Sequence, residues 1–281
     1  MGIVAAAIVT YNPNIERLGQ VIGSIENQVE KIIIVDNGSK NIELIKSLFT
    51  RMLYKLHFVF NTENKGLATA LNQVFEEAQN IGCQWVLTLD QDSLCSKDII
   101  RIYNRYVNSA NIGIISCKAV FNRPCTEQKS FEDISAKDID HCITGGSLIS
   151  VNAWKSVGGF DDILFIEWID FVFCKDIKLA SYRILQLDFE GVSQIGGTCK
   201  TKKIFNKTYV YSSYSEIRRY YQMRNLIYYY RKFKYNDINK IWLLRWVWTY
   251  IKGIILFEDN KLKKLMIVIR AMLDGQKMKI S

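Results

Sequence analysis

The sequence predicts an α/β protein with an open, mostly parallel sheet sandwiched by helices, followed by a C-terminal helical extension. Three observations support this fold class. Four short apolar runs alternate with helical periodicity over the first 90 residues, as expected for strands buried on both faces of a parallel sheet. A polar cluster follows each of the four runs. From about residue 214 the periodicity is helical and contains no proline.

The elements of the first 90 residues follow in regular order. Apolar runs predict strands at 3–9, 31–35, 57–60 and 85–89. Apolar residues at helical spacing predict helices at 15–27, 40–49 and 67–79. Because crossovers between parallel strands are right-handed, these helices should cover both faces of the sheet.

The middle of the chain is mixed, and the tail differs from the body. We expect strands at 112–121, 142–151 and 182–187, and a helix at 167–180. The change of character near residues 200–210 predicts two domains, 1–205 and 206–281. The second is a basic, aromatic helical region.

Composition limits the protein class. Hydrophobic residues make up 49% of the 281, which is enough for a sizeable core. The seven cysteines are odd in number and lack CxxC spacing, which favours reduced thiols in a cytoplasmic protein over a disulfide framework or a zinc site. The apolar start has no basic segment before it, so we expect no secretory signal.

Charge is unevenly distributed along the chain. Residues 1–190 carry 18 Lys/Arg and 23 Asp/Glu, whereas residues 191–281 carry 19 Lys/Arg and only 5 Asp/Glu. A basic tail on a mildly acidic body predicts an anionic partner for the tail, either membrane lipid, a diphosphate or nucleic acid.

The four polar clusters should meet at one edge of the sheet. They read TYNPN (10–14), DNGS (36–39), NTENKG (61–66) and DQDS (90–93). Open α/β sheets bind ligands at the carboxyl ends of their strands, where all four clusters lie. The joint placement therefore predicts a ligand site.

The pair Asp90 and Asp92 predicts a divalent cation. Two neighbouring carboxylates repel each other unless a cation or a proton intervenes. Mg²⁺ and Mn²⁺ prefer oxygen ligands and are commonly held by one or two carboxylates plus substrate phosphates. We expect Asp92 to meet a metal–diphosphate and Asp90 to share the ion or contact the nucleotide. The alternative is that the acids only cap the next helix.

The first half of the chain contains the motifs VTYNPN, VDNGS, NKGLATALN and LTLDQDS. Their order and spacing resemble those of the family-2 inverting glycosyltransferases with the GT-A fold. LDQDS, TYNP and a later FIEWID look most like bacterial rhamnosyltransferase-like members. The resemblance covers residues 3–200 well. It implies a deoxythymidine-diphosphate-activated rhamnose (dTDP-rhamnose) donor, a polyprenyl-linked glycan acceptor, and a location at the cytoplasmic face of the membrane.

The resemblance also implies roles for individual residues. The donor-binding set comprises Thr10, Tyr11, Asn12, Asp36, Asn64, Lys65, Gly66, Asn72, Asp90, Gln91 and Arg224. Three alternatives stay open. Asp36 would merely open a turn, Asn64 would cap a helix, and Asn72 would be a packing residue inside a helix.

The base of an inverting transfer must accept the proton of the acceptor hydroxyl. Matching FIEWID to the family pattern places this base at Asp170, with Glu167 as the second candidate. The alternative is that both acids only occupy the start of a helix, where the macrodipole favours negative charge. Many relatives carry a metal-binding His where this chain has Ser193 and Gln194, which weakens the expected metal site.

Trp and Tyr mixed with Lys and Arg in the tail suit a membrane interface, and the alternative is a helical bundle or an oligomer contact.

Rival functions are a glycosyltransferase using a uridine-diphosphate hexose, a nucleotidyltransferase, a nucleic-acid-binding module and an inactive scaffold. The absence of GxGxxG after the first strand counts against a dinucleotide dehydrogenase. Nucleic acid is not an expected partner.

Overall fold

The computed structural model describes residues 3–48, 55–126, 132–196, 199–204, 207–212, 214–236 and 238–280. The chain forms two compact units. Unit 1 contains Met1–Ile163 and Ile169–Gly196, and unit 2 contains Leu164–Trp168 and Gly197–Ser281. A short internal segment therefore belongs to the C-terminal unit. The independence of domains 1–205 and 206–281 stays a prediction.

Among the described residues of unit 1, nine strands form one sheet. They are β1 (Val4–Thr10), β2 (Lys31–Asp36), β3 (Leu56–Phe60), β4 (Trp85–Asp90), β5 (Leu94–Cys95), β6 (Ile112–Phe121), β7 (Ala136–Asp138), β8 (Ser147–Ser150) and β9 (Arg183–Gln194). The strand order is β3-β2-β1-β4-β8-β6-β9-β5, with β7 paired to β9. The sequence predicted the first four strands, β6, β8 within a longer range, and the first part of β9. The short strands β5 and β7 were not predicted.

The sheet is parallel in one half and mixed in the other. β1 pairs in parallel with β2 and β4, and β2 pairs in parallel with β3. β8 runs antiparallel between β4 and β6. The expected glycine-bearing strand at 142–151 is shorter than predicted, because β8 begins at Ser147 and the glycines lie in the turn before it.

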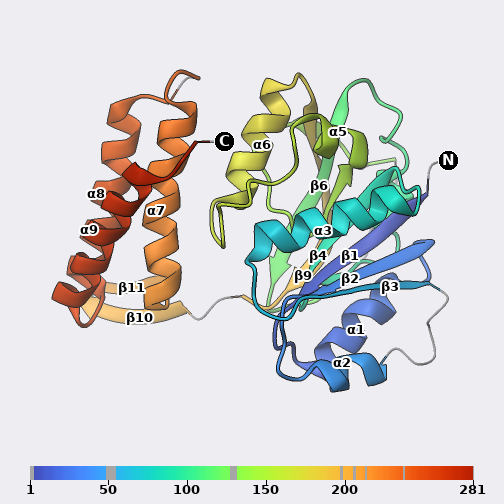
Figure 1. The fold of residues 1–281 in the computed structure, drawn as a ribbon, viewed down its shortest axis with the longest axis horizontal. Helices are drawn as coiled ribbons and strands as arrows, with labels where there is room; N and C mark the ends of the chain where they lie inside the picture. The colour runs from blue at the N-terminus through green and yellow to red at the C-terminus, as the bar shows by residue number, and fades with distance from the viewer. Residues whose placement is uncertain are drawn as a thin grey trace. The chain divides into compact units, whose positions relative to one another are not determined.

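Helices cover both faces of the sheet in unit 1. They are α1 (Ile15–Ile25), α2 (Ile42–Leu48), α3 (Leu67–Asn80), α4 (Ile99–Tyr103), α5 (Val151–Ser156) and α6 (Ile169–Leu179). The buried side chains of α1 share one core cluster with alternate residues of β1, namely Val4, Ala6 and Ile8. On the other side Phe75 of α3 stacks on Trp154 of α5. Figure 1 shows α3, α5 and α6 grouped together.

Unit 2 contains an antiparallel hairpin and three helices (Figure 1). Its elements are β10 (Cys199–Ile204), β11 (Lys207–Ser212), α7 (Glu216–Phe233), α8 (Lys240–Phe257) and α9 (Lys261–Lys277). α7 and α9 pack closely at Gly275, where an added Cβ would lie 2.6 Å from the Arg224 carbonyl oxygen. Within the described residues no helix is both long and apolar enough to cross a membrane.

Candidate active site

The ends of β1 and β2 are joined by side-chain hydrogen bonds. The Thr10 hydroxyl donates to Oδ1 of Asp36 at 2.9 Å, and both residues are fully buried. The other oxygen of Asp36 accepts from the Ser39 backbone N–H at 2.9 Å. Asn12 has a left-handed φ of 48°. Its backbone N–H donates to the Ser39 hydroxyl, and its Oδ1 accepts from the Lys40 N–H. These bonds fix the TYN and DNGS segments against each other at the predicted edge.

The third cluster is fixed to the second. The Asn37 amide donates to Oδ1 of Asn64 at 2.9 Å, and its Oδ1 accepts from the Lys65 N–H at 3.0 Å. Gly38 has φ 80°, and a Cβ there would lie 2.6 Å from the backbone of Glu63. The N-cap of α3 is Gly66, so Asn64 does not cap this helix. Asn64 instead supports the turn, because its Oδ1 accepts from the Gly66 N–H.

The fourth cluster is tied back to the first through Gln91. Its Oε1 accepts a 2.9 Å hydrogen bond from the Tyr11 backbone N–H. The guanidinium of Arg17 on α1 donates twice to the Asp92 carbonyl oxygen, at 2.9 and 2.7 Å. The four clusters that follow β1–β4 therefore form one continuous edge, as the sequence predicted.

Asp90 and Asp92 carry an excess of negative charge at this edge. Desolvation, with a smaller contribution from Asp92, raises the pKa of the Asp90 carboxyl to about 6, although the residue keeps a solvent-facing side. Desolvation also raises the pKa of Asp92, partly offset by its own backbone N–H and by Arg17. A cation would relieve the unfavourable pairing. The two carboxylates thus fit Mg²⁺ or Mn²⁺ completed by phosphate oxygens, although no described group of three His, Cys, Asp or Glu forms a complete metal cage.

Gln194 lies beside this pair. At the end of β9, its side-chain amide donates to Oδ2 of Asp90 at 2.8 Å and to the Ser93 hydroxyl at 3.0 Å. Sequence reasoning judged this position only as the place of a missing ligand. It missed that the amide holds the Asp90 carboxylate, because nothing local in the sequence pairs residues 90 and 194.

The turn before β8 connects Asp90 to the candidate base. A Cβ on Gly145 would lie 2.6 Å from Oδ2 of Asp90, so glycine lets this turn approach the carboxylate without displacing it. Asp170, in the first turn of α6, lines a narrow gap together with Thr144 and Ser147, and this gap has no room for a water molecule. The two predicted acids therefore lie near opposite parts of the same turn.

Comparisons with known proteins give the family. Residues 6–145, which contain all four polar clusters, match the model of glycosyl transferase family 2. The chain belongs to this family. It is 27% identical to the dTDP-rhamnosyl transferase RfbF of Shigella flexneri, over 96% of this chain and 94% of that protein.

Solved structures support the GT-A fold. The chain superposes on GalNAc-T7 with a TM-score of 0.62 at 12% identity, covering 87% of this chain and 54% of that one. The mannosyltransferase PcManGT of Pyrobaculum calidifontis gives 0.58 at 14% identity, with coverages of 99% and 76%. Residues 1–349 of S. aureus TarS give 0.57 at 15% identity, with coverages of 98% and 72%. At these identities the likeness concerns the fold alone, and the chain spans about half the length of GalNAc-T7.

In this glycosyltransferase the second candidate base is already engaged within unit 2. The Glu167 carboxylate accepts from Arg218 Nε at 2.6 Å and from the Gln222 amide at 3.3 Å. Both oxygens of this carboxylate therefore already accept hydrogen bonds from side chains of α7, which a substrate hydroxyl would have to displace. The role of Asp170 as the base stays a prediction.

The segment before Asp170 has an unusual backbone. Glu167 and Trp168 both have left-handed φ values, 68° and 67°, which are costly for residues other than glycine. The buried Asn225 of α7 stabilises this conformation, since its amide donates to the carbonyl oxygens of Ile166 and Glu167 at 2.8 and 2.9 Å. The resemblance pointed to Arg224, but this role of its neighbour Asn225 was not predicted.

Two further predicted donor-binding residues have structural partners. Asn72 donates to the Phe160 carbonyl and to Asp162, and its Oδ1 accepts from the Trp154 indole and the Phe160 N–H. These contacts support the packing alternative for Asn72. In unit 2 the Arg224 guanidinium lies 4.6 Å from the Tyr221 ring centroid and donates to the Asn225 side chain. A contact between Arg224 and a diphosphate stays a prediction.

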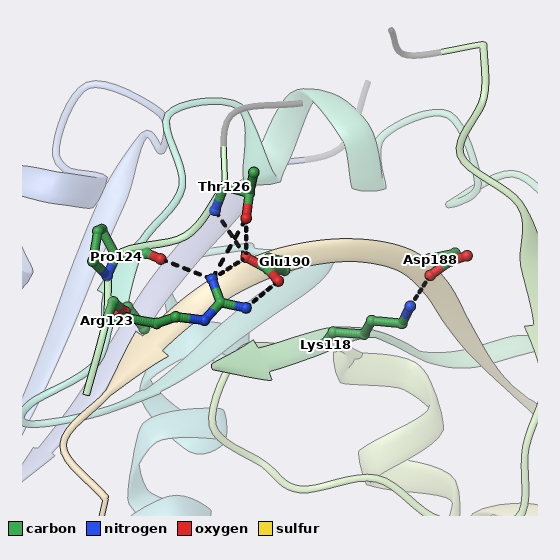
Figure 2. A network of polar contacts seen from close by, with 7 residues as sticks. Lys118, Arg123, Pro124, Thr126, Asp188 and Glu190 are labelled. Atoms are coloured by element: carbon green, nitrogen blue, oxygen red, sulfur yellow. Dashed lines mark hydrogen bonds and ion pairs between the residues drawn. The ribbon is translucent and has the colours of Figure 1, made fainter. Parts of the chain in front are cut away.

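The loop after β6 is anchored close to Gln194. Figure 2 shows the Arg123 guanidinium and Thr126 converging on the Glu190 carboxylate of β9. The hydrogen bonds from Arg123 and Thr126 lower the pKa of Glu190 to about 2. The Ser193 hydroxyl donates to the Arg123 carbonyl oxygen, so Ser193 supports this loop.

Proposed function

We propose that this glycosyltransferase moves L-rhamnose from dTDP-rhamnose to a hydroxyl group of a polyprenyl-linked glycan. The transfer is a single displacement that inverts the configuration at the anomeric carbon. The observation that carries the proposal is the arrangement around the turn at 144–146. Asp90 lies against Gly145, and Asp170 lines a narrow gap together with Thr144.

Each group has a defined task in this displacement. The edge formed by Thr10, Asp36 and Gln91 binds the nucleoside, because carboxylate and amide oxygens accept from base N–H and ribose hydroxyl groups. Asp170 accepts the proton of the attacking hydroxyl. A Mg²⁺ or Mn²⁺ ion held by Asp92 and Asp90 would offset the negative charge on the leaving diphosphate.

The choice of rhamnose follows from the relative that covers nearly the whole chain, the dTDP-rhamnosyl transferase RfbF. The named solved complexes hold other donors, such as GDP-mannose in PcManGT and UDP-GlcNAc in TarS. Because these structures share only the fold, a uridine-diphosphate hexose is the alternative donor. A panel of nucleotide sugars, scored by nucleoside diphosphate release, distinguishes the two.

We further propose that α9 lies on the membrane that carries the acceptor. One side of α9 exposes apolar residues at i, i+4, i+7 and i+11, which are Leu262, Met266, Ile269 and Leu273. Arg270 and Lys277 follow along the border of this stripe. A second copy of the chain would bring like charges together, whereas anionic lipid would neutralise them, at about 1 kcal/mol per cation.

The decisive experiment compares Asp170→Asn with Glu76→Gln, an exposed acid on α3. We expect Asp170→Asn to bind deoxythymidine diphosphate as the wild type does and to lose about 10²–10⁴-fold in transfer rate. Calorimetry measures binding, and product formation measures transfer. Transfer at the wild-type rate by Asp170→Asn would exclude it as the base.

A further inference from the structure

Two cysteines meet beside the candidate base in unit 1. Cys142 lies in the segment before β8, and Cys174 lies on α6, about one helical turn after Asp170. Their Sγ atoms are 3.9 Å apart, and both residues are free thiols. Sγ of Cys174 also lies 3.7 Å from the Cys142 carbonyl oxygen. The two thiols are therefore in direct contact, although 32 positions of sequence separate them.

The two thiols differ in their access to solvent. Cys142 is half-buried and lines a cavity of about 420 Å³ that also reaches Gly145. Cys174 is only 2% exposed and borders the narrow gap that Asp170 lines. A small oxidant can therefore reach Cys142 from the cavity, whereas Cys174 is shielded from solvent.

Cys142 is the more acidic thiol of the pair. A hydrogen bond from the Cys174 thiol lowers the pKa of Cys142, and burial opposes this effect only in part. Among the six cysteines whose side chains the structure describes, Cys142 is the one with a lowered pKa. Burial raises the pKa of the cysteines outside the pair, which are Cys83, Cys95, Cys117 and Cys125. Because the thiolate is the reactive form, Cys142 should react first with an oxidant.

Oxidation of this pair by hydrogen peroxide needs no other reactant. The Cys142 thiolate attacks one peroxide oxygen and the O–O bond breaks, which leaves a sulfenic acid on Cys142 and a hydroxide ion. The hydroxide recombines with the proton that Cys142 had released. The Cys174 sulfur then attacks Sγ of Cys142, so that an S–S bond forms, the S–O bond breaks, and the hydroxyl group leaves with the Cys174 proton as a second water. The two electrons that the sulfur atoms lose reduce the peroxide.

The disulfide would join the two chain segments beside Asp170. Bonded sulfur atoms lie about 2 Å apart, so the two Sγ atoms must approach each other by about 2 Å. This movement draws the segment before β8 toward α6, which carries Asp170 in its first turn. The same segment continues into Gly145, which lies against Asp90. Because a misplacement of about 1 Å can slow a reaction about 10²-fold, the disulfide should slow transfer.

We propose that Cys142 and Cys174 form a peroxide-sensitive thiol pair, and that a reversible disulfide between them slows glycosyl transfer. The thiol pair itself does not depend on the proposed function, whereas its effect on transfer rests on that function. A dithiol reductant reverses the oxidation by thiol–disulfide exchange and restores both free thiols.

The first test is chemical and uses the full-length chain. Trypsin cleaves after Lys137, Lys155 and Lys175, which places the two cysteines in separate peptides, 138–155 and 156–175. After treatment with equimolar hydrogen peroxide and alkylation of the remaining thiols, mass spectrometry should detect these two peptides joined. Dithiothreitol should separate them. Cys174→Ser should stop at the sulfenic acid, so that dimedone labels peptide 138–155 instead.

The second test compares the transfer rate of each protein before and after peroxide treatment. The wild type should lose at least about tenfold in rate and recover with dithiothreitol. Its affinity for deoxythymidine diphosphate should not change, because the nucleoside edge lies on other strands. Cys142→Ser should keep its own untreated rate. Cys125→Ser removes a half-buried thiol outside the pair and should respond to peroxide as the wild type does.

Each outcome decides one part of the proposal. Absence of the joined peptides overturns the thiol pair, and this readout uses the wild type alone, so it holds even if Cys142→Ser does not fold. Joined peptides with an unchanged transfer rate overturn the effect on transfer. If the untreated wild type transfers no sugar from any nucleotide sugar, the proposed function and the effect on transfer fail together, and the peptide analysis still decides the pair.

Discussion

The side-chain amide of Gln194 donates a 2.8 Å hydrogen bond to Oδ2 of Asp90, across 104 positions of sequence. A neutral amide thus lies next to the paired acids, one residue after Ser193, the position at which the resemblance implied a metal-binding His. The amide stabilises the Asp90 carboxylate but contributes no nitrogen lone pair to a metal. The proposed cation would therefore depend on Asp92, Asp90 and the phosphates of the donor.

Asp90→Asn should stabilise the ligand-free protein at pH 7. Its pKa, raised from 3.8 to about 6, means that the folded state holds the proton more tightly than the unfolded chain. Stability contributed by this group is present below pH 4 and is lost as pH rises through about 6. We expect a gain of about 1 kcal/mol, less than the full conversion of the pKa shift because the residue is partly exposed.

Thermal melts from pH 4 to pH 8 measure this effect. The gain should vanish near pH 4, where Asp90 is protonated in the wild type. Asp98→Asn, at a half-exposed acid paired with Arg101, serves as the control and should change little at any pH. A lower melting temperature of Asp90→Asn at pH 7 would contradict the conclusion that the charged Asp90 carboxylate lowers stability.

Asp92→Ala should remove the metal dependence of nucleotide binding. In the wild type, Mn²⁺ should raise the affinity for deoxythymidine diphosphate, because Asp92 and the diphosphate would hold the ion together. Calorimetry with Mn²⁺ and with EDTA measures the difference. Equal affinities of wild type and Asp92→Ala at every Mn²⁺ concentration would refute the metal role. Gln194→His, which adds an imidazole beside Asp90, should increase the Mn²⁺ effect.

Glu190→Gln should loosen the loop at 122–126. Glu190 accepts from Arg123 and from the Thr126 N–H and hydroxyl (Figure 2), and charge-assisted bonds of this kind are stronger than neutral ones. We expect a loss of about 1 kcal/mol in the free energy of unfolding and faster proteolysis within the loop.

Asp188→Asn on the same strand is the matched control for Glu190→Gln, because it removes a single exposed ion pair with Lys118. Its effect should stay below about 0.5 kcal/mol. Since the pKa of Glu190 is lowered to about 2, its contribution is present above about pH 4.5 and fades as pH falls toward 2. Equal effects of the two variants would contradict the loop-anchoring role.

Arg219→Ala should strongly destabilise unit 2. Arg219 and Glu258 form an ion pair with side chains only 3% and 7% exposed, and Lys264 contacts the same carboxylate at 2.8 Å. Removing one partner leaves an incompletely compensated buried charge, which costs about 3–5 kcal/mol. Lys263→Ala breaks an exposed pair with Glu216 and should cost less than about 1 kcal/mol. Chemical denaturation measures both, and similar losses would show that burial of the pair is unimportant.

Replacing Leu262, Met266, Ile269 and Leu273 by serine should release the protein from lipid. Sedimentation with vesicles of phosphatidylglycerol and phosphatidylcholine measures binding, which should fall at least tenfold and should weaken with salt in the wild type. Analytical ultracentrifugation of both proteins serves as the companion measurement. If the wild type does not bind vesicles, and if the wild type is oligomeric while the quadruple variant is monomeric, the stripe is an interface between copies instead.

The predictable part of the protein was the part whose signals are local. Each strand of β1–β4 is an apolar run that ends in its own polar cluster, so the edge carrying Thr10, Asp36 and Asp90 followed from order and spacing alone. The acid Asp170 came from its motif, and its place at the start of α6 agrees with the expected helix to within two residues.

The sequence determined the parallel half of the sheet, the polar edge and the family, because consecutive residues encode strand, turn and helix. Only the tertiary structure decided that Gln194 holds Asp90, that Asn225 supports the left-handed backbone at Glu167, and that Gly145 admits a turn against the carboxylate. These contacts join residues far apart in the chain. A hydrogen bond of this kind depends on how helices, strands and turns pack against one another, and a local pattern of residues does not predict that packing.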